Sequence, residues 1–384
     1  MMLEIRVPAE RMITVKASAF DRMWSDCQSD VLKAIQRVGA SGRYVLGSEG
    51  IRFEDRFASY SDQAHAVGCA SGLDALEIAL RLAGVGAGDT VLTSPLSAFA
   101  TALAILRLGA QPVFCDVDQH GLIDPEAAVG AFADHPQIRA IVPVHLYGHL
   151  ADMAALRALA DAHGAALIED AAQAVGASRD GLSPGALGEA ACYSFYPTKN
   201  LGCLGDGGAL TLAMSEQATR ARALRDYGQS AKYVHDEIGL NSRLDELHAA
   251  TLTDAFLPRL DGWLARRRQI AKRYLAEISS EAITLLPGPE PASGGWHLFP
   301  VLTRPGQRDA FLAHLKAHGI GAGLHYPTLI CDQKAYVDAH GASDPSQFAQ
   351  SRRFAETEVS LPIHPYLKEH EVDHVVASVN AWDG

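Results

Sequence analysis

Four short segments of the chain carry residues whose types and spacing could support chemistry. The first, Ser71-Gly72-Leu73, lies between an apolar run that ends at Ala70 and a helical pattern that begins at Asp74. Free backbone N–H groups at such a turn, with the positive end of the helix dipole, can hold a phosphate, and Ser71 would add a hydroxyl donor. A simple helix cap explains the same residues, so both interpretations stay open here.

The second segment places an acid at the end of an apolar strand pattern. Asp170 follows the run AALIE and would be costly to bury without a positive partner. That partner could be the protonated pyridine nitrogen of a cofactor, an arginine or a metal ion. Gln173 comes three residues later and can face the same side in a turn or helix. Capping of the next helix is the alternative role for Asp170.

The third segment, SFYPTKN, contains Ser194 and Lys199 and leads into the glycine-rich loop at 201–208. Most lysines are solvated surface charges. Small and apolar residues surround Lys199, and no acidic residue follows it before Asp206. We therefore expect burial to lower the pKa of its ammonium group toward that of a nucleophile.

The fourth segment, GLNSRLD at 239–245, begins a long helical pattern, and Asn241 or Ser242 is its predicted N-cap.

Together, a phosphate-binding turn, a buried strand-end acid and a lysine in one domain describe a site for pyridoxal phosphate better than a site for a nucleotide. The sequence has neither GxGxxG after its first strand nor GxxxxGK[ST]. His145 and His149 are four residues apart, but Gly148 interrupts any helix between them, so we expect no metal site.

The elements that must position these residues alternate between strands and helices. Apolar runs typical of strands occur at 64–70, 90–95, 111–117, 140–148, 165–171, 191–197 and 208–213. Amphipathic helical patterns separate them at 74–85, 98–110, 124–135 and 152–164. This order predicts an α/β fold with a mostly parallel sheet, in which ligands bind at the carboxyl ends of the strands.

The alternation of short strands and helices ends after Leu212, and longer helical patterns rich in charged residues follow. These patterns lie at 215–228 and 242–278, and the latter predicts a long helix that bridges two domains. A Pro- and Gly-rich loop at 286–295 then precedes the strand-like WHLFPVL, a helical pattern and the run IGAGLHYP. We expect a large domain at 1–250, with an N-terminal arm, and a smaller α/β domain at 251–384.

Composition narrows the classes of partner. The 384 residues are 48% apolar, and 33 basic against 45 acidic residues give a net charge of −12. That charge disfavours nucleic acid and anionic membranes as partners. The charged N-terminal residues do not resemble a signal peptide, and no long apolar stretch occurs. Six widely spaced cysteines are typical of reduced core residues. We therefore expect a cytoplasmic protein.

Several motifs resemble those of the DegT/DnrJ/EryC1/StrS sugar aminotransferases, which have the aspartate-aminotransferase fold of type I. The resemblance extends from about residue 42 to residue 367 and rests on the motifs GCASGLDALEIAL, QPVFCDVD, VHLYGHLADM, IEDAAQAVGA, SFYPTKNLGCLGDGGAL, GLNSRLDELHAATL, LHYP and SLPIHP. It implies that Lys199 forms the Schiff base with pyridoxal phosphate. Asp170 would then meet the pyridine nitrogen and Gln173 the ring O3′ oxygen.

The resemblance also assigns the phosphate site and a dimer. Ser194 and the turn at residues 71–73 would hold the cofactor phosphate, and Asn241 would reach it from the other subunit of a homodimer. The family usually carries an aromatic residue over the cofactor ring at the position of Ala98, so Phe99 is the candidate replacement. Leu73 stands where the family commonly has threonine, which removes one hydroxyl from the turn.

By the same resemblance, an amino acid, L-glutamate, donates the amino group. The cofactor would cycle through its pyridoxamine form, Lys199 would move the proton, and a nucleotide-linked keto-sugar would accept the amine. Because the chain is acidic, we expect Lys232 and Arg243 to supply local positive charge for the diphosphate. His325 and Tyr326 are candidates for substrate contact, with a structural role as the alternative.

Three other functions stay open. The chain could aminate a cyclitol or another small ketone. A sugar dehydratase of the same fold usually has histidine in place of the lysine, so Lys199 argues against that function. A non-catalytic ligand-binding or regulatory protein is the third, and the absence of a basic face weakens a DNA-binding version of it.

Overall fold

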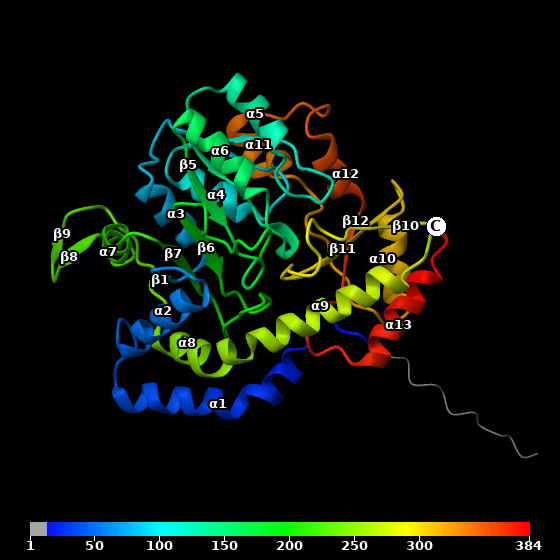
Figure 1. The fold of residues 1–384 in the computed structure, drawn as a ribbon, viewed down its shortest axis with the longest axis horizontal. Coiled ribbons are helices and arrows are strands. Elements are labelled where there is room, and N and C mark those ends of the chain that lie inside the picture. Colours follow the sequence, from blue (N-terminus) through cyan, green and yellow to red (C-terminus); the bar gives the residue numbers. More distant parts are fainter. Residues whose placement is uncertain (1–13) are drawn as a thin grey trace, which may run out of the picture.

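The computed structural model describes residues 14–384, which form two main β-sheets joined by a long helix (Figure 1). The larger sheet has seven strands in the order β1 (His65–Cys69), β7 (Gly208–Leu212), β6 (Ala190–Ser194), β5 (Ala166–Asp170), β4 (Ile138–Val142), β2 (Thr90–Thr93) and β3 (Gln111–Phe114). β7 runs antiparallel to both of its neighbours, whereas β6, β5, β4, β2 and β3 are parallel. The predicted α/β fold with a mostly parallel sheet is confirmed.

Alternating side chains of this sheet pack against helices on opposite faces. On β6, Ala191 and Tyr193 belong to a core shared with Phe53 and Phe57, whereas Cys192 belongs to a core on the other face. The first face is covered by α1 (Phe20–Ser41), α2 (Ser48–Tyr60), α5 (Pro125–Asp134), α6 (Met153–His163) and α8 (Glu246–Thr251), and the second by α3 (Gly72–Leu82), α4 (Phe99–Arg107) and α7 (Ser215–Leu224). Coverage of both faces leaves the strand ends as the accessible part of the sheet.

The smaller sheet is antiparallel, in the order β10 (Ile283–Leu285), β11 (Phe299–Thr303) and β12 (Glu358–Leu361). Its separate core includes residues of α9 (Leu260–Glu277), α10 (Arg308–Ala317) and α13 (Glu369–Asn380). α11 (Lys334–His340) and α12 (Ala349–Thr357) instead pack on the core of the larger sheet through Tyr336 and Phe354. The run at 320–327 forms no regular strand, although Gly323 bridges to Ser360. The domain division at residue 250 stays a prediction, and that position lies inside α8.

The long helix predicted at 242–278 begins later than expected, at Glu246, and its first part is not a regular α-helix. The chain instead forms α8, a π-helical turn at Leu252–Phe256, a short 3-10 turn at Leu257–Arg259 and then α9. Pro258 lies at the break, where it can supply no backbone N–H. Asp245, not Asn241 or Ser242, caps α8, because its carboxylate accepts a hydrogen bond from the His248 N–H.

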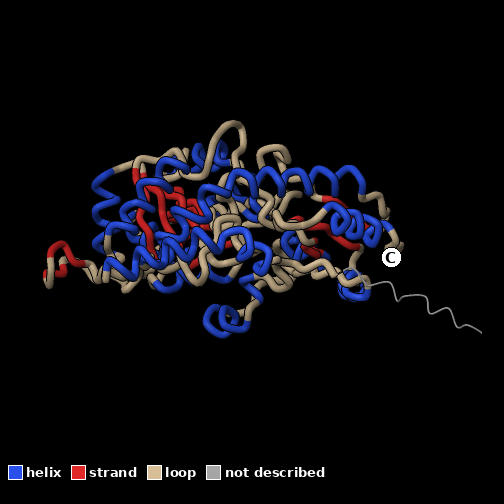
Figure 2. The backbone as a smooth tube through the Cα atoms, turned by 90° about the horizontal axis from the view of Figure 1, so that it is seen from below, coloured by secondary structure: helices blue, strands red, loops and turns tan. Residues whose placement is uncertain are grey.

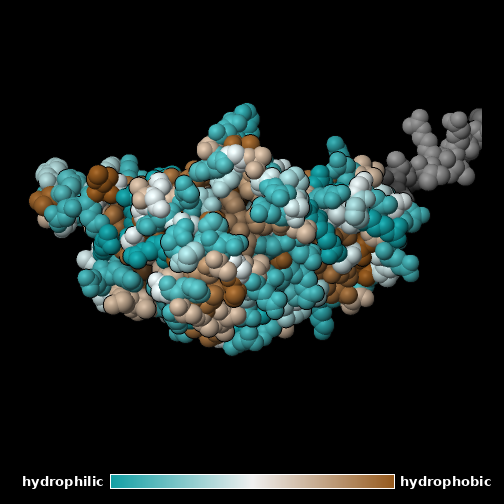
Figure 3. Space-filling model, turned by 90° about the horizontal axis from the view of Figure 1, so that it is seen from above, coloured by the Kyte–Doolittle hydropathy of each residue, from teal (hydrophilic) through white to brown (hydrophobic). Residues whose placement is uncertain are grey.

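A two-stranded hairpin of β8 (Gln229–Ala231) and β9 (Val234–His235) follows α7 and projects from the body of the molecule (Figures 1 and 2). Hydrophobic residues are visible on this projection (Figure 3). Ile238 is 88% exposed and Val234 is 50% exposed. Such exposure of apolar side chains on a projecting segment is typical of an interaction surface.

None of the helices in residues 14–384 combines the length and apolar character that a membrane span requires. All six cysteines are buried and unpaired.

Close packing between β7 and the turn after β1 gives a stability prediction. A Cβ atom added at Gly208 would lie 2.3 Å from the Ser71 carbonyl carbon and 2.7 Å from the Gly72 nitrogen. Because these are backbone atoms, we expect Gly208→Ala to lower the free energy of unfolding by about 1–3 kcal/mol in urea titrations. Gly86→Ala is the control, since a Cβ there meets nothing within 4 Å. Equal losses in both variants would contradict the account.

Candidate active site

Three of the predicted site segments meet at one edge of the larger sheet. β1, β6 and β5 run in the same direction, because β7 is antiparallel to both β1 and β6 and β5 is parallel to β6. Their carboxyl ends therefore lie on the same side. The Ser71 turn follows β1, the Lys199 loop follows β6, and Asp170 is the last residue of β5. The sheet topology thus brings the turn, the lysine and the acid together.

Asp170 is buried and has no ion-pair partner within residues 14–384. Its carboxylate accepts hydrogen bonds from the Thr101 hydroxyl at 2.8 Å and from the Ala172 N–H at 3.2 Å. Burial raises the pKa of Asp170, and these hydrogen bonds, with the positive charge of Lys199, oppose the rise. No helix begins directly after it, so helix capping does not explain this acid. A cation at this position would stabilise the carboxylate.

Lys199 lies in the loop between β6 and β7, where its own N–H donates to the Tyr196 carbonyl at 2.8 Å. Burial lowers the pKa of its ammonium group to about 8, and the negative charge of Asp170 opposes the shift. About a tenth of this amine is therefore neutral at pH 7, far more than for an ordinary lysine, and the neutral form is the one that acts as a nucleophile or base.

The turn at residues 71–73 packs directly against Ser194 at the end of β6. A Cβ atom added at Gly72 would lie 2.8 Å from the Ser194 Cβ, so the contact requires glycine. The Ser71 hydroxyl accepts a hydrogen bond from the Asp74 N–H and caps α3. Of the two roles considered from the sequence, the Ser71 hydroxyl therefore has that of the N-cap of α3. The same geometry leaves the first turn of α3, with Leu73, at the edge of the sheet beside Ser194, where an anion would be stabilised.

Gln173 connects the sheet edge to the smaller part of the molecule. Its side-chain oxygen accepts a hydrogen bond from the Tyr147 N–H at 2.6 Å, and its amide nitrogen donates to the Tyr326 hydroxyl at 3.2 Å. Burial raises the pKa of Tyr326 to about 12, with a further contribution from Asp170, so the phenol keeps its proton. Tyr326 therefore lies at the same site as Asp170, and its contact with a substrate stays a prediction.

Two residues of β12 hold His325 in place. Its backbone N–H donates to Glu358 at 2.7 Å, and its Nδ1 atom lies 2.9 Å from the Ser360 hydroxyl. Burial, and then the charge of Lys199, lower the pKa of His325 to about 4, so the imidazole is neutral. It lines a cavity of about 280 Å³ together with Thr198 and Arg267.

The residues expected to carry positive charge are arranged differently. Lys232 is exposed at the tip of the projecting hairpin, 5.2 Å from the Tyr233 ring. Arg243 forms an ion pair with Asp226 at 2.7 Å, so its charge is partly neutralised within the chain. Asn241 is exposed. Within one chain, none of these three contacts the Lys199 loop through an ion pair or side-chain hydrogen bond.

Ser242, between Asn241 and Arg243, contributes a contact that sequence patterns did not reveal. It is buried, accepts a hydrogen bond from the Ala70 N–H at 3.0 Å and donates to Asp74 at 2.8 Å. The segment that follows the hairpin therefore runs beside the Ser71 turn, although its exposed side chains face elsewhere.

Phe99 is the first residue of α4 and is half-buried, and Ala98 is the N-cap. Thr101, on the same first turn, donates to Asp170, so the beginning of α4 lies next to the acid. Thr101 was missed as a functional candidate, because only the fold places it there. The histidines considered for a metal have other partners: His145 lies 2.8 Å from Glu169, and His149 packs edge-on against Trp296.

The pKa of Lys199 gives a direct prediction. We expect reductive methylation of the cofactor-free protein, followed by mass spectrometry, to show half-maximal modification of Lys199 near pH 8, about 2 units below an ordinary lysine. The exposed Lys334, measured in the same digest, is the control for the pH dependence of the methylation reaction at an ordinary lysine. A Lys199 profile that reaches half-maximum only near pH 10 would contradict a desolvated amine.

Comparisons with known proteins agree with this geometry. The model of the DegT/DnrJ/EryC1/StrS aminotransferase family matches residues 25–380. The chain is 44% identical to the erythromycin biosynthesis sensory transduction protein EryC1 of Saccharopolyspora erythraea, over 93% of this chain and 96% of that protein. It is 43% identical to dTDP-3-amino-3,4,6-trideoxy-alpha-D-glucose transaminase of Streptomyces venezuelae, over 94% and 93% of the two chains.

A solved structure supports the same relationship. The crystal structure of S. venezuelae DesV in complex with a ketimine intermediate superposes with a TM-score of 0.91 at 41% identity, and the match covers 98% of this chain and 99% of that chain. Both the sequence match and the shared fold extend over nearly the whole molecule. The chain belongs to the DegT/DnrJ/EryC1/StrS aminotransferase family.

Proposed function

We propose that this chain is a pyridoxal-phosphate-dependent aminotransferase that moves an amino group from an amino acid, L-glutamate, to a nucleotide-linked keto-sugar. The observation that carries the proposal is that Lys199, whose amine has a lowered pKa, and the buried Asp170, which forms no ion pair within residues 14–384, lie at the same edge of the sheet. A protonated pyridine ring bound between them would satisfy both groups.

The residues at this edge fit the cofactor. Asp170 would hold the ring nitrogen, Gln173 the O3′ oxygen and Lys199 the aldehyde carbon. Ser194 and the turn at residues 71–73 would hold the phosphate, where backbone N–H groups and the dipole of α3 favour an anion. When bound, pyridoxal phosphate supplies a ring that withdraws the negative charge developing on the donor Cα.

Lys199 has two tasks in this scheme. Its Nζ atom would first hold the cofactor at the aldehyde carbon, C4′. Once an amino acid has displaced it, the free amine would take the proton from the donor Cα and deliver it to C4′. A pKa of about 8 suits both directions, because the amine is not fully protonated near neutral pH and its ammonium form releases the proton more readily than that of an ordinary lysine. Phe99, at the start of α4, is the proposed stacking partner of the ring.

The acceptor is proposed from the relatives and from the site. The S. venezuelae relative is named for a dTDP-linked amino-sugar. His325 and Tyr326 line the side of the site formed by the smaller sheet and would contact the sugar. Lys232 and Arg243 would supply positive charge for the diphosphate, which a chain of net charge −12 must concentrate locally.

A homodimer would bring that positive charge to the site. The hairpin that carries Lys232 projects away from its own body and exposes Ile238 and Val234. In a dimer with two-fold symmetry, the same segment of each subunit can reach the site of the other. Asn241 would then complete the phosphate site across the interface. The buried, unpaired cysteines favour a reducing, cytoplasmic location.

A regulatory role is the second candidate, because a 44% identical relative is named a sensory transduction protein. The two functions differ in a simple assay. We expect purified protein loaded with pyridoxal phosphate to lose its visible absorbance band on addition of L-glutamate and to recover it on addition of a dTDP- or UDP-linked keto-sugar. Lys199→Ala removes the base and is expected to lower turnover by 10³-fold or more. A wild-type protein whose band responds to no amino acid would contradict the enzymatic function.

The shared site gives a second prediction. Lys199→Ala and Asn241→Ala homodimers should each be weakly active. Subunit exchange in an equal mixture produces mixed dimers in which one of the two sites is intact, so we expect recovery of about a quarter of wild-type activity. No recovery above the two separate variants, with dimers verified by light scattering, would show that Asn241 does not act across the interface.

A further inference from the structure

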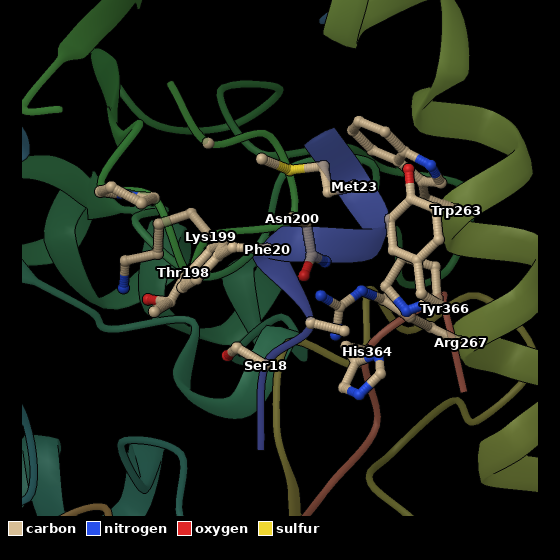
Figure 4. Close-up of a pocket in the computed structure, with 14 residues that line it drawn as sticks. Ser18, Phe20, Met23, Thr198, Lys199, Asn200, Trp263, Arg267, His364 and Tyr366 are labelled. Carbon is tan, nitrogen blue, oxygen red and sulfur yellow. The ribbon is translucent and has the colours of Figure 1, made fainter. Parts of the chain in front are cut away.

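Arg267, on α9, is a buried cation without a carboxylate partner. Its side chain is only 6% exposed, and no ion pair involves it within residues 14–384. In Figure 4, its guanidinium group points from α9 into a pocket whose opposite wall is the loop of Thr198, Lys199 and Asn200. Buried arginine side chains normally pair with an acidic side chain, so the guanidinium group of Arg267 requires an explanation.

The hydrogen bonds of Arg267 leave one edge free. Its Nη1 atom donates to the carbonyl oxygens of Trp296 at 3.1 Å, His297 at 3.3 Å and Ile363 at 3.3 Å. Its Nε atom is enclosed and has no partner in the described chain, and Nη2 donates no hydrogen bond there either. The three carbonyls fix the plane of the guanidinium group. The Nε–Nη2 edge is the fork that binds a carboxylate through two parallel hydrogen bonds.

The surroundings of Arg267 suit one small anion. It lines the cavity of about 280 Å³ described above, together with three histidines, His297, His325 and His364. Burial lowers the pKa of all three, so they are neutral, and Arg267 is the one permanently charged side chain among the described residues of the cavity wall. A volume near the lower limit for small-molecule sites admits an amino acid but not a whole nucleotide-linked sugar.

Arg267 and Lys199 also lie close to a common group. Both charges lower the pKa of His297, after the larger effect of burial, and both residues line the pocket of Figure 4. In an α-amino acid, the carboxylate and the reacting amino group are attached to the same carbon. A carboxylate held by Arg267 would therefore bring the donor amine toward the loop of Thr198 and Lys199, because Thr198 lines both the cavity and the pocket of Figure 4.

We infer that the free Nε–Nη2 edge of Arg267 binds the α-carboxylate of the amino-acid donor. This inference rests on the proposed aminotransferase function and names the residue that selects its donor. The competing explanation is a structural one, in which Arg267 only ties α9 to the carbonyl groups of the smaller domain.

Arg268 provides a matched control for that structural role. It is the next residue of α9 and donates to three backbone carbonyls, those of Gly294, Gly176 and Ser293. It does not line either cavity that Arg267 lines. Arg268→Gln therefore removes the same kind of contacts without removing the proposed carboxylate site.

The experiment compares wild type, Arg267→Gln, Arg267→Lys and Arg268→Gln, each loaded with pyridoxal phosphate and checked by thermal unfolding. The change in visible absorbance is titrated with L-glutamate, with L-glutamine, which lacks the distal carboxylate, and with L-isoglutamine, whose α-carboxylate is an amide. Steady-state measurements then give the KM for glutamate and the KM for the keto-sugar separately.

We expect wild type and Arg268→Gln to prefer glutamate over isoglutamine strongly. Arg267→Gln should weaken apparent glutamate binding by roughly a hundredfold, lose the preference over isoglutamine and leave the KM of the keto-sugar unchanged. Arg267→Lys keeps the charge but not the planar edge, so an intermediate loss is expected, and it serves as the test should Arg267→Gln not fold.

Two results would overturn the inference while leaving the proposed function intact. One is a preference for glutamate over isoglutamine that persists in Arg267→Gln. The other is equal weakening of donor and acceptor in Arg267→Gln and Arg268→Gln, as a structural role predicts. A wild-type protein that responds to no amino acid would instead contradict the proposed function, and the inference with it.

Discussion

The cost of burying charge at one edge of the larger sheet determines how this site is built. Asp170 is buried at the end of β5, where the side-chain partners found within residues 14–384 are the Thr101 hydroxyl and the Ala172 N–H, and burial raises its pKa. Lys199, on the loop after β6, is half-buried, and burial lowers its pKa to about 8. Burial therefore disfavours the charged form of both side chains, the carboxylate of Asp170 and the ammonium group of Lys199. A ligand with a cationic ring nitrogen and a reactive carbonyl would relieve both at once.

The remaining parts of the fold keep these two groups in place. Parallel β6 and β5 bring the lysine loop and the acid to one edge, and glycine at 72 and 208 lets the turn after β1 lie against Ser194. Gln173 links this edge to Tyr326 from the smaller part of the chain. The substrate side is therefore formed by segments that are far apart in the sequence, and movement of one sheet relative to the other would change the site.

Sequence patterns located the groups whose signal is local. Asp170 ends a strand pattern and Lys199 enters a glycine-rich loop, so both could be identified without a structure. Thr101 and Arg267 could not be identified from sequence, because their contacts are with distant residues. Asp170 is 69 positions from Thr101, and Ile363 is 96 positions from Arg267. The helix predicted at 242–278 is irregular for a different reason. Pro258 lies within the amphipathic pattern and supplies no backbone N–H, so regular α-helical hydrogen bonding is interrupted there although the pattern continues on both sides.

The proposed function requires that Lys199 carries the cofactor. Reduction of the pyridoxal-phosphate-loaded protein with borohydride, followed by peptide mapping with mass spectrometry, tests this attachment. We expect a single peptide, the one containing Lys199, to gain the mass of the reduced pyridoxyl phosphate group. A label on another lysine, or no label on a protein that shows the cofactor absorbance band, would contradict it.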